Sequence, residues 1–230
     1  MKKEYKSILS SLEDVVFDGM SIAVGGFGLC GIPENLILGL KRLSVKNLKI
    51  ISSNAGVDNF GIGIIIKNMQ VDSLIASYVG ENNELSEQFI KKKIKIEFCP
   101  MGTLAERIRA GGAGIPGFYT RTGVGTVLEK GKEVKYFEGK KYLLEHGIKT
   151  DLSLVKAWKG DHEGNLIFRK TARNFNPNMA TCGKICIAEV EKLVPNGKLK
   201  PDSIHTPGIF VDRIIECKFE KRIEFLKTKD

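Results

Sequence analysis

Residues 25–31 form the part of this sequence best suited to chemistry. They read GGFGLCG and lie between an apolar run at 21–24 and a second apolar stretch that begins after Pro33. This order predicts a strand, a glycine turn and a helix, with Pro33 in the first helical turn, where its missing N–H costs nothing. Backbone N–H groups at such a helix N-terminus attract anions. The loop is therefore a candidate site for a phosphate, a carboxylate or an acyl oxyanion.

The same loop matches the G-x-G-x-x-G pattern of dinucleotide-binding proteins at Gly26, Gly28 and Gly31. A dinucleotide site also needs an acidic residue at the end of the next strand, about 20 residues further on, to hold the ribose hydroxyls. Here the next strand ends in Ser-Ser-Asn at 52–54, and Asp58 lies beyond the turn. The sequence therefore argues against nicotinamide binding, and a tight turn without a ligand remains an alternative.

Two more loops have compositions suited to close packing of backbone against another molecule. Residues 111–126 are dense in glycine, and residues 53–59 combine serine, asparagine, glycine and aspartate. Together the three loops indicate backbone packed closely against a ligand or another protein chain.

The elements that position these loops alternate between strands and helices in the first half of the chain. We predict strands at 20–24, 48–52, 71–77 and 94–98, and helices at 5–17, 33–42, 61–68, 82–92 and 103–110. Such alternation is typical of an α/β fold, with a largely parallel sheet flanked by helices.

The second half of the chain is rich in β-hairpins. One predicted hairpin covers 135–144 and turns at Gly139, and another turns near Gly164. Strands at 185–190 and 209–215 are expected to complete the sheet. Because no long Pro- or Ser-rich linker interrupts the chain, we predict a single domain over 1–230.

Composition narrows the function further. The net charge is +9, yet there is no RNA-binding aromatic signature and no zinc finger, so we expect no nucleic-acid partner. No stretch approaches the roughly 18 apolar residues of a membrane span, and the N-terminus has no secretory apolar region. We expect a soluble, cytoplasmic protein.

The five cysteines are scattered without metal-ligand spacing, so we predict reduced thiols and no metal site.

Several longer motifs occur in one order along the chain and resemble the alpha (A-type) chain of the 3-oxoacid coenzyme A-transferases. These are family I enzymes of the succinyl-CoA:acetoacetate and acetate/butyrate:acetoacetate type. The motifs are DGM at 18–20, GGF at 25–27, GIP at 31–33, NAGVD at 54–58, GTLAE at 102–106, GGAGIP at 111–116 and ARNFNP at 172–177.

The resemblance implies an α/β enzyme component that is inactive alone. In the family the nucleophilic glutamate lies on the beta (B-type) subunit, so no catalytic residue is expected in this chain, and an A2B2 heterotetramer is the expected assembly. Coenzyme A is a substrate, and no cofactor is implied. The resemblance assigns coenzyme A contacts to Gly25, Gly26, Phe27, Gly28, Leu29, Cys30 and Gly31, and a supporting acyl or oxyanion site to Ser53, Asn54 and Met101.

Two positions depart from the family pattern, and a third resembles the nucleophile motif of the beta subunit. Many family members have Asn where this chain has Ser53, which can still donate a hydrogen bond. Gln is common where this chain has Met101, which cannot donate one. Glu81 follows a glycine as the nucleophile of the beta subunit does, but Asn82 and Glu84 behind it predict a helix start instead.

Two other functions remain as alternatives. A sugar-phosphate isomerase or deaminase-like enzyme would use a related α/β fold, although the sequence offers no convincing acid/base set for it. A non-catalytic nucleotide-binding protein would explain the glycine loop alone.

Overall fold

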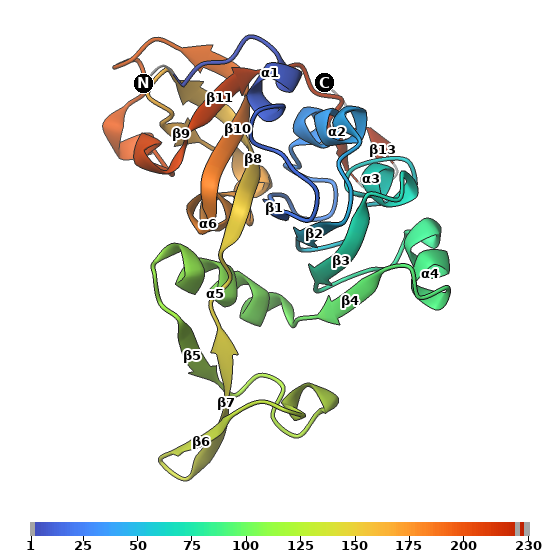
Figure 1. Cartoon of the computed structure of the whole chain (residues 1–230). Helices are drawn as coiled ribbons and strands as arrows, with labels where there is room; N and C mark the ends of the chain where they lie inside the picture. The colour runs from blue at the N-terminus through green and yellow to red at the C-terminus, as the bar shows by residue number, and fades with distance from the viewer. Residues whose placement is uncertain (1–2, 224–225, 228–230) are drawn as a thin grey trace.

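A largely parallel sheet forms the centre of the molecule in the computed structural model, which describes residues 3–223 and 226–227. Within those residues the sheet has eight strands in the order β11-β10-β8-β1-β2-β3-β4, and β9 pairs antiparallel with β8 (Figure 1). The remaining pairs are parallel. The strands are β1 Ser21–Val24, β2 Leu48–Ile51, β3 Val71–Ala76, β4 Lys95–Phe98, β8 Thr150–Asp161, β9 Leu166–Ile167, β10 Gly183–Val194 and β11 Arg213–Glu216. The predicted α/β class is confirmed.

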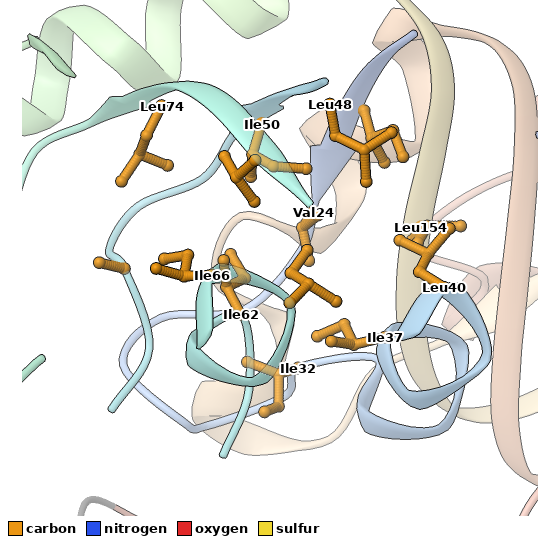
Figure 2. Packing of buried hydrophobic residues seen from close by; sticks show 14 of the residues in the cluster. Val24, Ile32, Ile37, Leu40, Leu48, Ile50, Ile62, Ile66, Leu74 and Leu154 are labelled. Atoms are coloured by element: carbon orange, nitrogen blue, oxygen red, sulfur yellow. The ribbon is translucent and has the colours of Figure 1, made fainter. Parts of the chain in front are cut away.

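Helices cover both faces of this sheet, which is why its strands are apolar at successive positions. Val24 and Ile50 point to the face covered by α1 to α4, whereas Ala23 and Ile51 point to the face covered by α5 and α6 (Figure 2 shows the first face). The helices are α1 Ile8–Leu12, α2 Glu34–Leu43, α3 Gly63–Lys67, α4 Asn83–Ile90, α5 Met101–Gly112 and α6 Asn176–Cys182.

Helix α2 follows the glycine loop and shows how the sequence builds these elements. Pro33 precedes its first residue, Glu34 lies in the first turn, and Lys41 and Arg42 lie in the last. These charges oppose the helix dipole at both ends. Leu36, Ile37 and Leu40 are fully buried against the sheet, so one face of α2 anchors the loop to the core.

A second, smaller sheet carries one of the predicted hairpins away from the body. Strands β5 Gly117–Thr120, β7 Lys140–His146 and β6 Val134–Phe137 form an antiparallel sheet in that order. It projects as an arm beyond α5 (Figure 1). The chain turns at Gly139, where φ is 72°. The hairpin near Gly164 is also present, between β8 and β9. Both hairpin predictions are confirmed.

Two predicted elements are shorter than expected. The helix expected at 5–17 covers only Ile8–Leu12. It begins late because Glu4 and Tyr5 pair with Ile214 at the edge of β11. The strand at 209–215 begins only at Arg213, after a 3-10 turn at Gly208–Phe210. Among the described residues no helix combines the length and apolarity that crossing a membrane requires.

Candidate functional site

The carboxyl ends of three neighbouring parallel strands bring three loops together. The loops after β1, β2 and β3 border a cavity of about 260 Å³, which we call the strand-end pocket. Ligand sites in open α/β sheets occur at this edge. The lining residues are Phe27, Gly28, Leu29, Asn54, Gly56, Val57, Tyr78, Gly80 and Glu81.

The second loop holds the glycine loop from one side through its side chains. Ser53 Oγ donates to the carbonyl of Gly26 at 3.0 Å, and Asn54 Nδ2 donates to the carbonyl of Gly28 at 3.2 Å. Asn54 is itself fixed, because its Oδ1 accepts from the N–H of Gly56 at 2.7 Å. The structure therefore brings the predicted residues Ser53 and Asn54 against the predicted loop, as anchors of its backbone.

Residues near the start of α6 hold the glycine loop from the other side. Asn174 Nδ2 donates to the carbonyl of Cys30 at 3.0 Å, and Asn176 Nδ2 donates to the carbonyl of Gly31 at 2.9 Å. Asn176 also explains one glycine, since a Cβ on Gly25 would lie 2.0 Å from Asn176 Oδ1. The ARNFNP motif thus acts on the loop from more than 140 residues away in the sequence.

These anchors occupy the carbonyl groups of the loop and leave its N–H groups available. Gly26, Gly28 and Gly31 have φ values of 110°, 58° and 73°, which turn the backbone sharply. In the part of the chain that the structure describes, the N–H groups of Gly28, Leu29 and Gly31 have no hydrogen-bond acceptor. Successive N–H groups in such turns form a concavity that binds anions.

Two residues singled out in the sequence have different positions relative to the strand-end pocket. Met101 is the first residue of α5, at the carboxyl end of β4. It packs against the core on the sheet face that α5 and α6 cover, and it does not line the strand-end pocket. Glu81 lines the pocket with a φ of 67°. Asn82 behind it caps α4 by accepting from the N–H of Leu85 at 2.9 Å, so the predicted helix start is confirmed.

Glu189 contributes to the site in a way that the sequence reasoning missed. This fully buried carboxylate on β10 accepts from the N–H groups of Asn35 at 3.3 Å and Leu36 at 2.9 Å, in the first turn of α2. Burial raises the pKa of Glu189 to about 8, although the two N–H groups favour its charged form. The available signal was an acidic residue inside the strand predicted at 185–190.

A second cavity lies along the other end of the glycine loop. It measures about 370 Å³ and is bordered by residues 29–32 of the loop. We call it the basic groove, because Lys156, Arg169, Lys170, Lys221 and Arg222 line it, with Glu34 and Glu191 as its acids.

Cysteine chemistry in the described residues is limited. Cys30 is half-exposed, with its Sγ 3.5 Å from Thr171 Oγ1. Burial raises the pKa values of Cys182 and Cys186 to about 12, which keeps both as thiols. No group of three His, Cys, Asp or Glu residues in that part of the chain could hold a metal ion.

Known proteins resemble this chain over nearly its whole length. A family profile described as coenzyme A transferase matches residues 6–217. The A-type chain of the succinyl-CoA:3-ketoacid coenzyme A transferase of Xanthomonas campestris pv. campestris (strain B100) is 54% identical over 223 residues, which are 96% of this chain and 92% of that protein. The A-type chain of a probable succinyl-CoA:3-ketoacid coenzyme A transferase of Bacillus subtilis (strain 168) is 56% identical over 221 residues, covering 94% and 93% of the two chains.

Solved structures share the fold. An acyl-CoA transferase from E. coli O157:H7, solved as a thioester complex with CoA, superposes with a TM-score of 0.84 at 22% identity. The match covers 97% of this chain and 48% of that one. At this level of identity the likeness concerns the fold alone.

Proposed function

Since this chain belongs to the coenzyme A transferase family, we propose that it is the alpha subunit of a 3-oxoacid CoA-transferase. The enzyme would move CoA between an acyl-CoA and a 3-oxo or short-chain acid, with acetoacetate paired to succinate, acetate or butyrate. The observation that carries this proposal is identity above 50% to two proteins named as the A-type chains of such enzymes, over more than 90% of both chains in each pair.

A partner chain follows from the same names, since an A-type chain implies a B-type chain beside it. We propose an A2B2 assembly in which the beta subunit contributes the nucleophilic glutamate. Coenzyme A is then a substrate, and the reaction needs no cofactor.

The chemistry proposed is covalent transfer in two halves. The carboxylate of the partner's glutamate attacks the thioester carbonyl, and the CoA thiolate leaves to give a mixed anhydride. The thiolate then attacks the glutamyl carbonyl, which forms glutamyl-CoA and releases the first acid as a carboxylate. A second acid reverses both steps and leaves as its CoA thioester.

The glycine loop would stabilise charge in these steps. Each attack places negative charge on a carbonyl oxygen, and donors already oriented in a closed site stabilise such an oxyanion strongly. The N–H groups of Gly28 and Leu29 are unpaired in the described structure, and the loop that carries them is held by four side-chain anchors. This arrangement supports their assignment to the acyl or coenzyme A contacts.

A direct assay tests the proposed function. Acetoacetyl-CoA consumption would be measured with the purified chain alone and with the complex pulled down from its native cells, with succinate, acetate and butyrate offered in turn. We expect transfer only in the complex that contains a second chain. Activity of the chain alone would contradict the need for a beta subunit, and Glu81 would be the first residue to replace. Failure of both samples would refute the transferase proposal.

The acid preference should depend on Met101, the side chain at the start of α5. A thioether cannot donate a hydrogen bond to a second carboxylate on the acid, whereas a glutamine amide can. We expect Met101→Gln to raise kcat/KM for succinate relative to butyrate about tenfold, the effect of one hydrogen bond to a charged group. Steady-state kinetics of the assembled complex would measure this ratio.

The same substitution at Met69, which is 45% exposed in the loop after α3, provides the control. Met69→Gln should leave the succinate-to-butyrate ratio unchanged. An unchanged ratio in Met101→Gln would show that this side chain does not contact the acid.

A further inference from the structure

The basic groove carries more positive charge than its own acids neutralise. Glu191 lies between Lys156 and Lys221, and the Nζ atom of each lysine forms an ion pair with its carboxylate. Burial alone would raise the pKa of Glu191, but hydrogen bonds from these two lysines hold it below its ordinary value. The acid in this triad is therefore ionised and shared between two cations, which leaves a net positive charge.

The other acid of the groove faces backbone donors. Glu34 Oε1 accepts from the N–H of Glu220, in the segment that follows β11. Burial raises the pKa of Glu34, although hydrogen bonds from backbone N–H groups oppose this. The partners of both acids are therefore groups other than Arg169 and Lys170, the two cations that line the rest of the groove.

Arg169 and Lys170 form that wall without partners of opposite charge. In the described chain no carboxylate lies within ion-pair distance of either side chain, and the Arg169 guanidinium rests over the ring of Trp158 at 5.6 Å. Lys170 has a φ of 51°, a conformation that costs a non-glycine residue energy and persists only where neighbours impose it. The segment thus holds two uncompensated cations at the rim of a cavity.

The backbone adds a second, independent feature of an anion site. The N–H groups of Gly31 and Ile32, which border the same groove, have no acceptor among the residues that the structure describes. The backbone around these N–H groups is held in place, because Asn174 and Asn176 donate hydrogen bonds to the carbonyl oxygens of Cys30 and Gly31. N–H groups fixed next to unpaired Arg and Lys side chains match the donors that proteins use for phosphate groups.

We propose that the basic groove binds the phosphate groups of the coenzyme A substrate. This inference rests on the proposed function, because the substrates of a CoA-transferase are a carboxylic acid and a CoA thioester. Only the thioester carries phosphates, and only phosphates bear the clustered charge that suits two free cations and two N–H groups. The glycine loop lies between the two cavities and lines both.

Kinetics with full and truncated thioesters test the proposal on the assembled complex. KM would be measured for acetoacetyl-CoA and for acetoacetyl-pantetheine, which lacks the phosphates, with Arg169→Gln and Lys170→Gln variants. Each variant should raise KM for acetoacetyl-CoA about tenfold, the loss of one charge-assisted hydrogen bond. KM for the pantetheine thioester and for the acid should match those of the unmodified complex.

Controls separate charge at the groove from folding and from general electrostatics. Arg169→Lys keeps the charge and should recover most of the affinity, which also covers the case in which Arg169→Gln folds poorly. Lys130→Gln removes an exposed lysine outside the groove and should leave both KM values unchanged. Equal KM increases for the two thioesters, or no increase for either, would overturn the proposal.

Direct binding distinguishes failure of this inference from failure of the proposed function. If the unmodified complex transfers no CoA, calorimetric titration with CoA still compares it with the Arg169→Gln and Lys170→Gln variants. Weaker CoA binding by the variants would support the groove as a phosphate site even then. Identical binding, or none by the unmodified complex, would refute it.

Discussion

Replacing Asn176 by Asp should lower the free energy of unfolding by about 3 kcal/mol, because a buried carboxylate oxygen would then face carbonyl oxygens. Asn176 is fully buried, and its Nδ2 donates to the carbonyls of Gly31 at 2.9 Å and Ala172 at 3.0 Å. Its Oδ1 accepts from the N–H of Lys156 at 2.9 Å. Asp has the same shape but no donor, so the glycine loop would lose its anchor. Urea unfolding would measure the change.

The same substitution two residues along α6 gives a matched control. Asn178 is half-buried, and its side chain has no hydrogen-bond partner within the described residues. An Asp there lies in the first turn of the helix, where negative charge is favourable. Asn178→Asp should therefore change stability by less than about 0.5 kcal/mol. Equal losses for the two variants would show that the anchoring bonds contribute little.

Gly31→Ala should strongly destabilise the glycine loop itself. At a φ of 73° an added Cβ would lie 2.7 Å from the carbonyl oxygen and 3.0 Å from the Cα of Ala172. Both are backbone atoms that cannot rotate away. The left-handed conformation costs about 1 kcal/mol and the overlap about 2 kcal/mol more, so we expect a total loss of about 3 kcal/mol. Activity of the assembled complex should fall with it, because the loop must shift.

Gly114 separates conformational strain from the clash. Its φ of 74° is nearly the same, but an added Cβ would meet nothing within 4 Å. Gly114→Ala should cost only the conformational term, about 1 kcal/mol. Thermal and urea unfolding of both variants would measure the difference. If Gly31→Ala lowered the free energy of unfolding no more than Gly114→Ala does, the backbone at Ala172 would move to accommodate the added methyl group, and the predicted clash would be refuted.

Local pattern predicted the elements well wherever neighbouring residues alone decide them. The alternation of apolar runs and glycine turns located β1 to β4 and the helices between them, and Asn82 marked the start of α4. The predictions were wrong in extent at 5–17 and at 209–215. In the first case, pairing of the N-terminal segment with β11 competes with the start of the helix. That competition depends on a strand about 200 residues away in the sequence, so no local pattern reports it.

By itself, the sequence determined the α/β class, the hairpins at Gly139 and Gly164, and a glycine loop suited to anions. Only the tertiary structure decided how that loop is held. Ser53 and Asn54 from one side and Asn174 and Asn176 from the other occupy its carbonyls and leave N–H groups available. The physical reason is that a hydrogen bond depends on distance and direction between groups far apart in the chain. Residue type and spacing specify neither this distance nor this direction. The anchors, the buried Glu189 and the basic groove could therefore be identified only from the tertiary structure.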